Sequence, residues 1–249
     1  MGNHIPLYNF IKLKDEIIID GIYTFLYQEK GESFIFPGET HDFWELLYMD
    51  KGSAYLLIDD KGFKINQGEL FFFNKNQNHI IWSDSNIAPF FLTISFNMCF
   101  HDDKFFEFKR FSVTDDIKEI IGKMVNERFN AFEGDINTSL GKIKNDALIG
   151  AEQLIKIYLT ELLIKLYRLG DIQTLKDTSV QSSIITQKSE NLIFERSICF
   201  IKSNINSKLY LENICDSIPV SPSYLNRIYN KICGMSVMGY VNHLKLDRS

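Results

Sequence analysis

Four residues near the start of the chain have the types and spacing of a polar site. Glu39, His41 and Glu45 follow one another at short intervals, and His79 lies in a later segment. Imidazoles and carboxylates can hold a divalent metal ion where the side chains of neighbouring strands converge inside a barrel. His41, Glu45 and His79 are therefore candidate metal ligands.

The same residues also fit a second interpretation, which we favour, in which no metal or other cofactor is bound. Pockets for small molecules are mostly apolar and contain a few placed polar groups, and aromatic residues are frequent in this region. The expected effector-binding residues are Glu39, His41, Glu45, His79 and Trp82. A sugar, an aromatic acid and a peptide-like signal all remain open as the effector.

Strands must position these side chains. Residues 1 to about 100 are dense in short β-type segments, separated by turns that carry Gly, Asp or Asn. Many short strands at regular intervals predict a β-barrel or jelly roll. The expected strands cover residues 16–19, 23–27, 33–36, 44–49, 53–58, 62–65, 69–73, 80–83 and 90–96.

The hydrophobic period changes to that of helices after Asp115. Apolar residues mark one face of a segment that ends at Phe129, and a second helical pattern covers 148–169. This helical hairpin either covers the barrel or also forms a dimer seam, and the sequence leaves both open. Residues 170–189 are polar and lack a sustained period, so we expect a linker there. A further helix is expected over 190–204.

Two short helices separated by a tight turn are predicted near the end of the chain. The first covers about 211–218 and is broken by Pro219. Ser221 can cap a new helix, Pro222 suits its first position, and Gly234 is a left-handed C-cap. The second helix is expected to bury Tyr224, Leu225, Ile228, Tyr229 and Ile232. Such a helix-turn-helix places its second helix in the major groove of DNA.

The residue types of this segment closely resemble the AraC family of bacterial transcription regulators. The resemblance is carried by Leu211–Cys215, Val220–Lys231, Gly234–Ser236 and Tyr240–Val241, with Cys215 and Cys233 as departures from the usual residues. It implies that residues at the start of the second helix reach the bases. The expected DNA-binding residues are Ser221, Ser223, Asn226, Arg227 and Lys231. Arg227 suits guanine, Asn226 suits adenine, and Lys231 suits a phosphate.

The spacing around the first site resembles the two cupin motifs, and AraC-like regulators often carry a cupin domain at this end. Glu39 stands where the metal-binding form has its first histidine, while Asn74, Asn76 and Ser83 replace its usual proline, glycine and asparagine. The implied fold class is α+β, with a cupin-like barrel or jelly roll, a helical hairpin and an all-α helix-turn-helix unit. The expected domains are 1–169 for effector binding and dimerisation, 170–189 for the linker, and 190–249 for DNA binding.

AraC-like regulators contain two helix-turn-helix units joined by a long helix. This sequence ends inside that helix, so only the first unit is expected. We therefore expect weak DNA binding by this chain and partial support for Val237, Val241 and Leu244. Residues 190–249 carry a net charge of +2 and the remainder carries −7, which places the acidity of the chain outside the predicted DNA-binding unit.

The function implied by these features is that of a ligand-responsive DNA-binding regulator, which we expect to be an activator and a homodimer rather than an enzyme. The alternative is a metallo-cupin enzyme that uses His41, Glu45 and His79. No apolar run has the length of a membrane span and no signal peptide is recognisable, so we expect no membrane partner and a cytoplasmic location.

Overall fold

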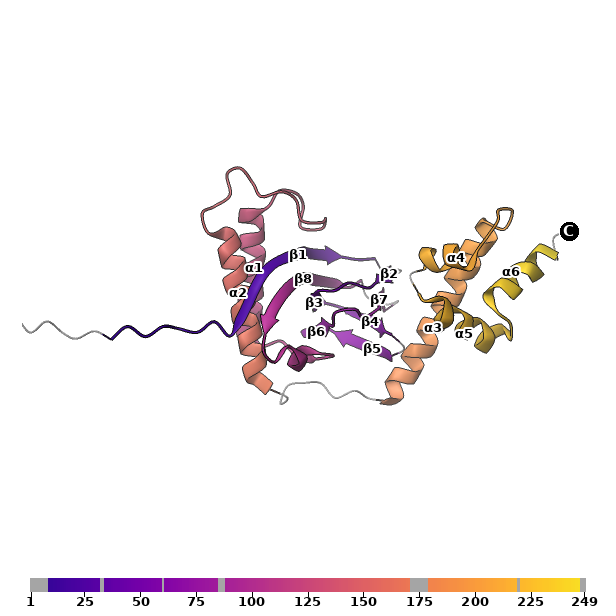
Figure 1. Ribbon diagram of the computed structural model, residues 1–249, viewed down its shortest axis with the longest axis horizontal. Coiled ribbons are helices and arrows are strands. Elements are labelled where there is room, and N and C mark those ends of the chain that lie inside the picture. Colours follow the sequence, from indigo (N-terminus) through magenta and orange to yellow (C-terminus); the bar gives the residue numbers. More distant parts are fainter. Residues whose placement is uncertain are drawn as a thin grey trace, which may run out of the picture.

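The computed structural model describes residues 9–31, 34–59, 61–84, 88–170, 179–218 and 220–246. It consists of two antiparallel sheets packed face to face, with a helical layer on the outer side of each sheet (Figure 1). The α+β fold class and the cupin-like barrel predicted from the sequence are confirmed. No helix in these ranges is long and apolar enough to cross a membrane.

The larger sheet has the strand order β1-β8-β3-β6-β9, and the smaller has the order β2-β7-β4-β5. The strand bounds are β1 Ile17–Glu29, β2 Ile35–Glu39, β3 Trp44–Lys51, β4 Ser53–Ile58, β5 Lys61–Asn66, β6 Glu69–Phe73, β7 His79–Ser83, β8 Phe90–Phe100 and β9 Arg110–Ser112. Two expected segments merge into the single long strand β1, and β9 was not expected. A short 3-10 helix, η1, covers Asp103–Phe106.

Successive side chains on a strand point to opposite faces of the sheet, so the apolar residues of each strand are shared between the barrel interior and the helical layer outside it. On β3, Leu47 and Met49 point into the space between the two sheets, whereas Leu46 and Tyr48 belong to the cluster under the hairpin helices. On β7, Ile81 points into the barrel and Ile80 points outward. The barrel interior is therefore filled by aliphatic and aromatic side chains over most of its length.

The outer face of the larger sheet is covered by α1 (Asp115–Ala131) and α2 (Ala151–Leu169). Their buried stripes include Ile117, Met124, Leu159 and Leu163, as the helical period predicts. Phe129 was expected on this buried face, but it is 47% exposed because the buried stripe of the last helical turn passes through Arg128 and Ala131 instead.

The outer face of the smaller sheet is covered by α3 (Ser179–Ser203), α4 (Leu211–Ser217), α5 (Pro222–Cys233) and α6 (Val237–Leu246). Leu57, Ile80 and Trp82 of the sheet belong to the same apolar cluster as the cores of these helices. The helix α3 begins at Ser179, so the second half of the expected linker is helical, while 171–178 and Pro219 lie outside the described residues.

The bounds of α5 match the prediction because local signals fix both ends. The Ser221 hydroxyl accepts a hydrogen bond from the Tyr224 backbone N–H at 3.2 Å, Pro222 occupies the first turn, and Gly234 has φ 71°. Ile232, expected inside, is 39% exposed. Val237 and Val241 were expected to be partly unsupported; both are buried because α3 and α5 pack over them.

Candidate functional site

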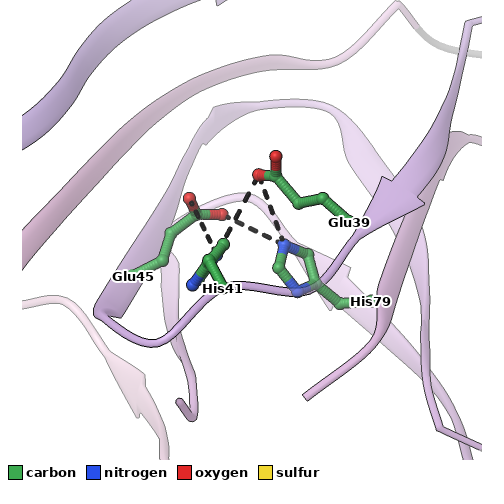
Figure 2. Close-up of side chains that lie close together, drawn as sticks. All are labelled: Glu39, His41, Glu45 and His79. Atoms are coloured by element: carbon green, nitrogen blue, oxygen red, sulfur yellow. Dashed lines mark ion pairs between the residues drawn. The ribbon is translucent and has the colours of Figure 1, made fainter. Parts of the chain in front are cut away.

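One end of the barrel gathers the four polar residues singled out by their spacing. Glu39 ends β2, His41 lies in the following loop, Glu45 is near the start of β3, and His79 starts β7. Glu39 and His79 are direct cross-strand partners, and Glu45 points inward like Leu47 and Met49. The four side chains therefore converge on one point, as Figure 2 shows.

The distances within this Glu39/His41/Glu45/His79 cluster are short but exceed those of direct hydrogen bonds. The Nε2 atom of His79 lies 3.5 Å from Glu45 Oε1, and that of His41 lies 3.7 Å from Glu45 Oε2. Both Nε2 atoms lie 3.9 Å from Glu39 Oε1. One ligand atom from each residue lies within 4.8 Å of all the others.

The other ring nitrogen of each histidine fixes the tautomer. The Nδ1–H of His41 donates to the Phe43 carbonyl at 3.0 Å, and that of His79 donates to the Gln77 carbonyl at 3.2 Å. Because a carbonyl can only accept, the neutral rings present the Nε2 lone pair to the cluster. Both Nε2 atoms are buried, and neither has a hydrogen-bond partner among the residues that the structure describes.

Neighbouring aromatic rings and a hydroxyl hold the cluster in place. His41 stacks on Phe43 with ring centroids 4.0 Å apart, and His79 stacks on Phe73 at 4.3 Å. The Ser95 hydroxyl donates to Glu45 Oε2 at 2.7 Å. Supporting contacts of this kind orient ligands and limit their motion. Sequence reasoning missed Ser95, whose position depends on the pairing of β8 with β3.

Burial and mutual charge set the protonation of the cluster. Desolvation and the nearby Glu45 carboxylate raise the pKa of Glu39 above its usual value. Burial alone would lower the pKa of His79, but the nearby Glu45 carboxylate, 3.5 Å from Nε2, keeps that pKa above its usual value. The cluster therefore favours a positive charge between its two carboxylates.

The donor set fits a divalent transition-metal ion. Zinc binds imidazole nitrogen and carboxylate oxygen at about 2.0–2.2 Å, which places neighbouring ligand atoms of a tetrahedral site about 3.4 Å apart. The observed separations of 3.5, 3.7 and 3.9 Å need only small side-chain adjustments to reach that geometry. Glu39 is the fourth donor, beside the three candidate ligands expected from the sequence.

Trp82, expected beside these residues, lies elsewhere. It stands on the opposite face of β7 from His79, and it packs in the apolar cluster shared with α3. The spacing of three residues from His79 already implied opposite faces, because side chains on a strand alternate with a period of two. The structure thus brings together Glu39, His41, Glu45 and His79 and leaves Trp82 outside.

The expected DNA-binding residues lie on α5 and at its start. Ser221, Ser223, Arg227 and Lys231 are exposed, whereas Leu225, Ile228 and Tyr229 are buried. Asn226 is half-buried, and its Oδ1 accepts a hydrogen bond from the Val237 backbone N–H at 3.1 Å. Asn226 therefore ties α5 to the start of α6, a structural role that the sequence did not predict.

Two of these residues contact Glu190 on α3. The buried Glu190 carboxylate lies 2.5 Å from Lys231 Nζ and 3.8 Å from Arg227 Nη2. Sequence reasoning missed Glu190 because the pairing depends on how α3 packs against α5. The acidic residue neutralises part of the positive charge that α5 presents.

A cleft of about 710 Å³ separates the cluster end of the barrel from α4 and α5. Glu39, which also belongs to the cluster, lines the barrel side, and Ser221 and Pro222 line the other side. The side chain of Glu39 is 48% exposed, in contrast to the buried His41, Glu45 and His79. Glu39 thus belongs to the cluster and also lines the cleft that faces the start of α5.

Two packed sheets with a histidine and carboxylate cluster at one end define a cupin-like domain. Residues 22–99 match the family model described as the AraC-like ligand binding domain. This match confirms the resemblance to the AraC family that was predicted from the sequence. No curated protein matches the chain.

Several solved structures share parts of the fold. A ToxT variant from Vibrio cholerae is 13% identical over 94% of this chain and 82% of that chain, with a TM-score of 0.38. The AraC-like transcriptional activator CuxR is 15% identical over 84% and 67%, with a TM-score of 0.33. A predicted oxalate decarboxylase from Thermotoga maritima is 18% identical over 31% and 69%, with a TM-score of 0.30.

Proposed function

We propose that this protein is a ligand-responsive, DNA-binding transcription regulator. The observation that carries the proposal is an AraC-like ligand binding domain in the same chain as α4 and α5. These two helices have the lengths and the tight connection of a helix-turn-helix. Residues 1–169 would bind the effector and 190–249 would bind DNA, with 170–189 connecting them.

The DNA-facing surface would be the exposed side of α5. Ser223, Arg227 and Lys231 share this side, and Ser221 lies at its beginning. Arginine can bond guanine through two atoms, and lysine contacts phosphate as a point charge. Because Asn226 is held by the Val237 backbone, we assign it to positioning α5 rather than to reading adenine.

The effector would bind at the Glu39/His41/Glu45/His79 cluster. Glu39 lines both the cluster and the cleft to Ser221, so a ligand that draws Glu39 inward changes the barrel surface facing the start of α5. This connection gives the effector a direct physical route to the DNA-binding helices. Activation of transcription is the expected outcome of that movement.

DNA binding can be tested by selection from a random duplex library at low salt with the whole chain. We expect one enriched motif, bound more weakly by Arg227→Ala by about 1–3 kcal/mol. Lys202→Ala, which removes an exposed α3 cation, is the matched control and should leave affinity nearly unchanged. Failure to enrich any motif, or equal affinities for Arg227→Ala and Lys202→Ala, would contradict the proposal.

A divalent metal ion is a specific candidate for the effector. The two buried Nε2 atoms lack hydrogen-bond partners within the described part of the chain and are aimed between two carboxylates, which favours a metal ion over a neutral organic ligand. When bound, the ion would supply positive charge and Lewis acidity at the cluster. His41, Glu45, His79 and Glu39 would hold it, while Ser95 would keep Glu45 oriented.

A metallo-enzyme is the rival interpretation of this same cluster. Elemental analysis of protein purified without chelators tests whether a transition metal is present. A metal that changes the affinity of the selected DNA motif supports the regulator. A stoichiometric metal with no effect on DNA affinity favours the enzyme.

A further inference from the structure

A groove of about 880 Å³ runs along the outer edge of β1 and is walled by α2. Six consecutive β1 residues, from Ile17 to Ile22, line it. Consecutive residues on a strand point to opposite faces, so a groove lined by all six must follow the backbone edge itself. On the helical side it is lined by residues spaced along one face of α2, namely Glu152, Gln153, Lys156, Ile157 and Thr160.

Among the residues that the structure describes, no strand lies beside the β1 edge facing this groove. β1 is the terminal strand of its sheet and, within that part of the chain, pairs with β8 alone. Farther along the same strand, the Tyr27 N–H bonds the Ile136 carbonyl at 3.1 Å, so a loop reaches that end. Over 17–22, no segment within the described ranges pairs with the outer edge. An open edge is a template for another extended segment.

The segment just before β1 has the properties of such a partner. Residues 9–16 are extended and run away from the body of the protein (Figure 1). Their apolar side chains lie in solvent, with Phe10 91% exposed, Ile11 77% and Leu13 85%. Ile11 and Leu13 alternate with Lys12 and Lys14, which is the pattern of a half-buried strand.

We propose that the β1–α2 groove receives residues 9–16 of a second copy of this chain. The segment of each copy adds antiparallel to the β1 edge of the other, in a reciprocal dimer with two-fold symmetry. Ile11 and Leu13 bury their side chains on the α2 side of the groove, where Ile157 is now 48% exposed.

Charge supports this pairing. Lys12 and Lys14 alternate with Ile11 and Leu13, so they face the other side of β1, where Asp20 lines the groove; Lys156 is the one basic lining residue within the described ranges. In the single chain Lys14 bonds the nearby Glu16 at 2.9 Å on the exposed surface. Exchange of the segments replaces this solvent-exposed contact with pairing across the interface.

The segment is poorly suited to folding back into its own groove. A return along β1 needs a tight turn within Lys14, Asp15 and Glu16. Two-residue hairpin turns require positive φ angles and most often contain Gly, which is absent from these three residues.

The mass of the whole chain in solution, followed by light scattering over a range of concentrations, tests the proposal. Wild type is expected to be dimeric, and Ile11→Glu/Leu13→Glu should raise the dimer dissociation constant at least tenfold. Leu148→Glu/Ile149→Glu, which alters exposed apolar residues before α2, is the matched control and should remain dimeric. A monomeric wild type, or equal dissociation constants for both double variants, would overturn the proposal.

Hydrogen exchange locates the contact. Amides in 17–22 should become more protected as the concentration of wild type increases. Protection that is independent of concentration in a monomer would indicate a fold-back in the same chain and would contradict the exchange. Loss of the dimer in Phe129→Glu alone would place the seam on the helical hairpin instead. These measurements involve no DNA, so they fail or succeed independently of the proposed regulatory function.

Discussion

The buried carboxylate of Glu190 on α3 bonds the ammonium group of Lys231 on α5 at 2.5 Å. Glu190 is 4% exposed, whereas the Lys231 side chain is 56% exposed. Arg227 also approaches this carboxylate. One acidic residue therefore both anchors α5 to α3 and reduces the positive charge on the surface proposed to meet DNA.

Glu190→Gln should have two opposite effects. Loss of the charged hydrogen bond should lower the free energy of unfolding by about 1–3 kcal/mol. Nonspecific affinity for duplex DNA should increase, with a steeper dependence on salt, because Arg227 and Lys231 are no longer neutralised. Urea denaturation and DNA titrations at several salt concentrations measure these effects. Glu195→Gln, at an exposed α3 position, is the control; identical behaviour of the two variants would refute the assignment.

Tyr229→Phe should destabilise the α3–α5 contact. The Tyr229 hydroxyl and the Ser197 hydroxyl share a buried hydrogen bond of 2.7 Å, and burial raises the pKa of Tyr229 to about 12. Removal of one hydroxyl should cost about 1 kcal/mol. Thermal and urea unfolding measure this loss, with Tyr210→Phe at a half-exposed position as the control. No difference between these variants would mean that the buried bond does not contribute.

Asp84 makes stability depend on pH. The hydrogen bond from Lys64, 2.8 Å long, is the main cause that holds the pKa of Asp84 below its usual value. A carboxylate with a lowered folded-state pKa stabilises the protein above its unfolded pKa of about 4. This contribution disappears as pH falls through the lower folded-state value.

Asp84→Asn should therefore lose about 0.5–1 kcal/mol of stability at pH 7 and progressively less at an acidic pH below about 4. Urea unfolding of wild type and variant at both pH values measures the difference. Asp146→Asn, at an exposed position, should show no such dependence. A constant difference between Asp84→Asn and wild type at both pH values would contradict the role of the ion pair with Lys64.

A divalent ion should stabilise the barrel through the Glu39/His41/Glu45/His79 cluster. Binding at one hundred times the dissociation constant adds about 2.7 kcal/mol to folding stability. Zinc or manganese should raise the melting temperature of wild type but not that of His79→Ala. His101→Ala removes an exposed histidine outside the cluster and should respond like wild type. An equal shift in His79→Ala would place metal binding at another site.

Much of this structure follows from local signals in the sequence. The strands over 53–58 and 69–73 and the helix over 222–233 have the predicted bounds, because alternation, turn residues and caps act over short distances. Convergence of His41, Glu45 and His79 was also predicted, since it follows from strand alternation and the cupin-like spacing.

Other features depend on packing that no local pattern encodes. The Glu190 contact requires the crossing of α3 over α5, and the Asn226 contact requires the path of the chain from α5 to α6. The early start of α3 at Ser179 was missed because its polar residues lack a helical period. Trp82 is a different case. It lies three residues after His79 on the same strand, so its orientation to the opposite face could have been inferred from the sequence.

The shared apolar cluster between the smaller sheet and the last four helices has a consequence for biosynthesis. Leu57, Ile80 and Trp82 are made long before α3, whose Ile193 and Ile201 complete their cluster. During translation, the newly formed barrel exposes this apolar face of the smaller sheet until α3, α4, α5 and α6 have left the ribosome. Exposed apolar surface of this kind promotes aggregation. The helices that would read DNA thus also shield the nascent barrel.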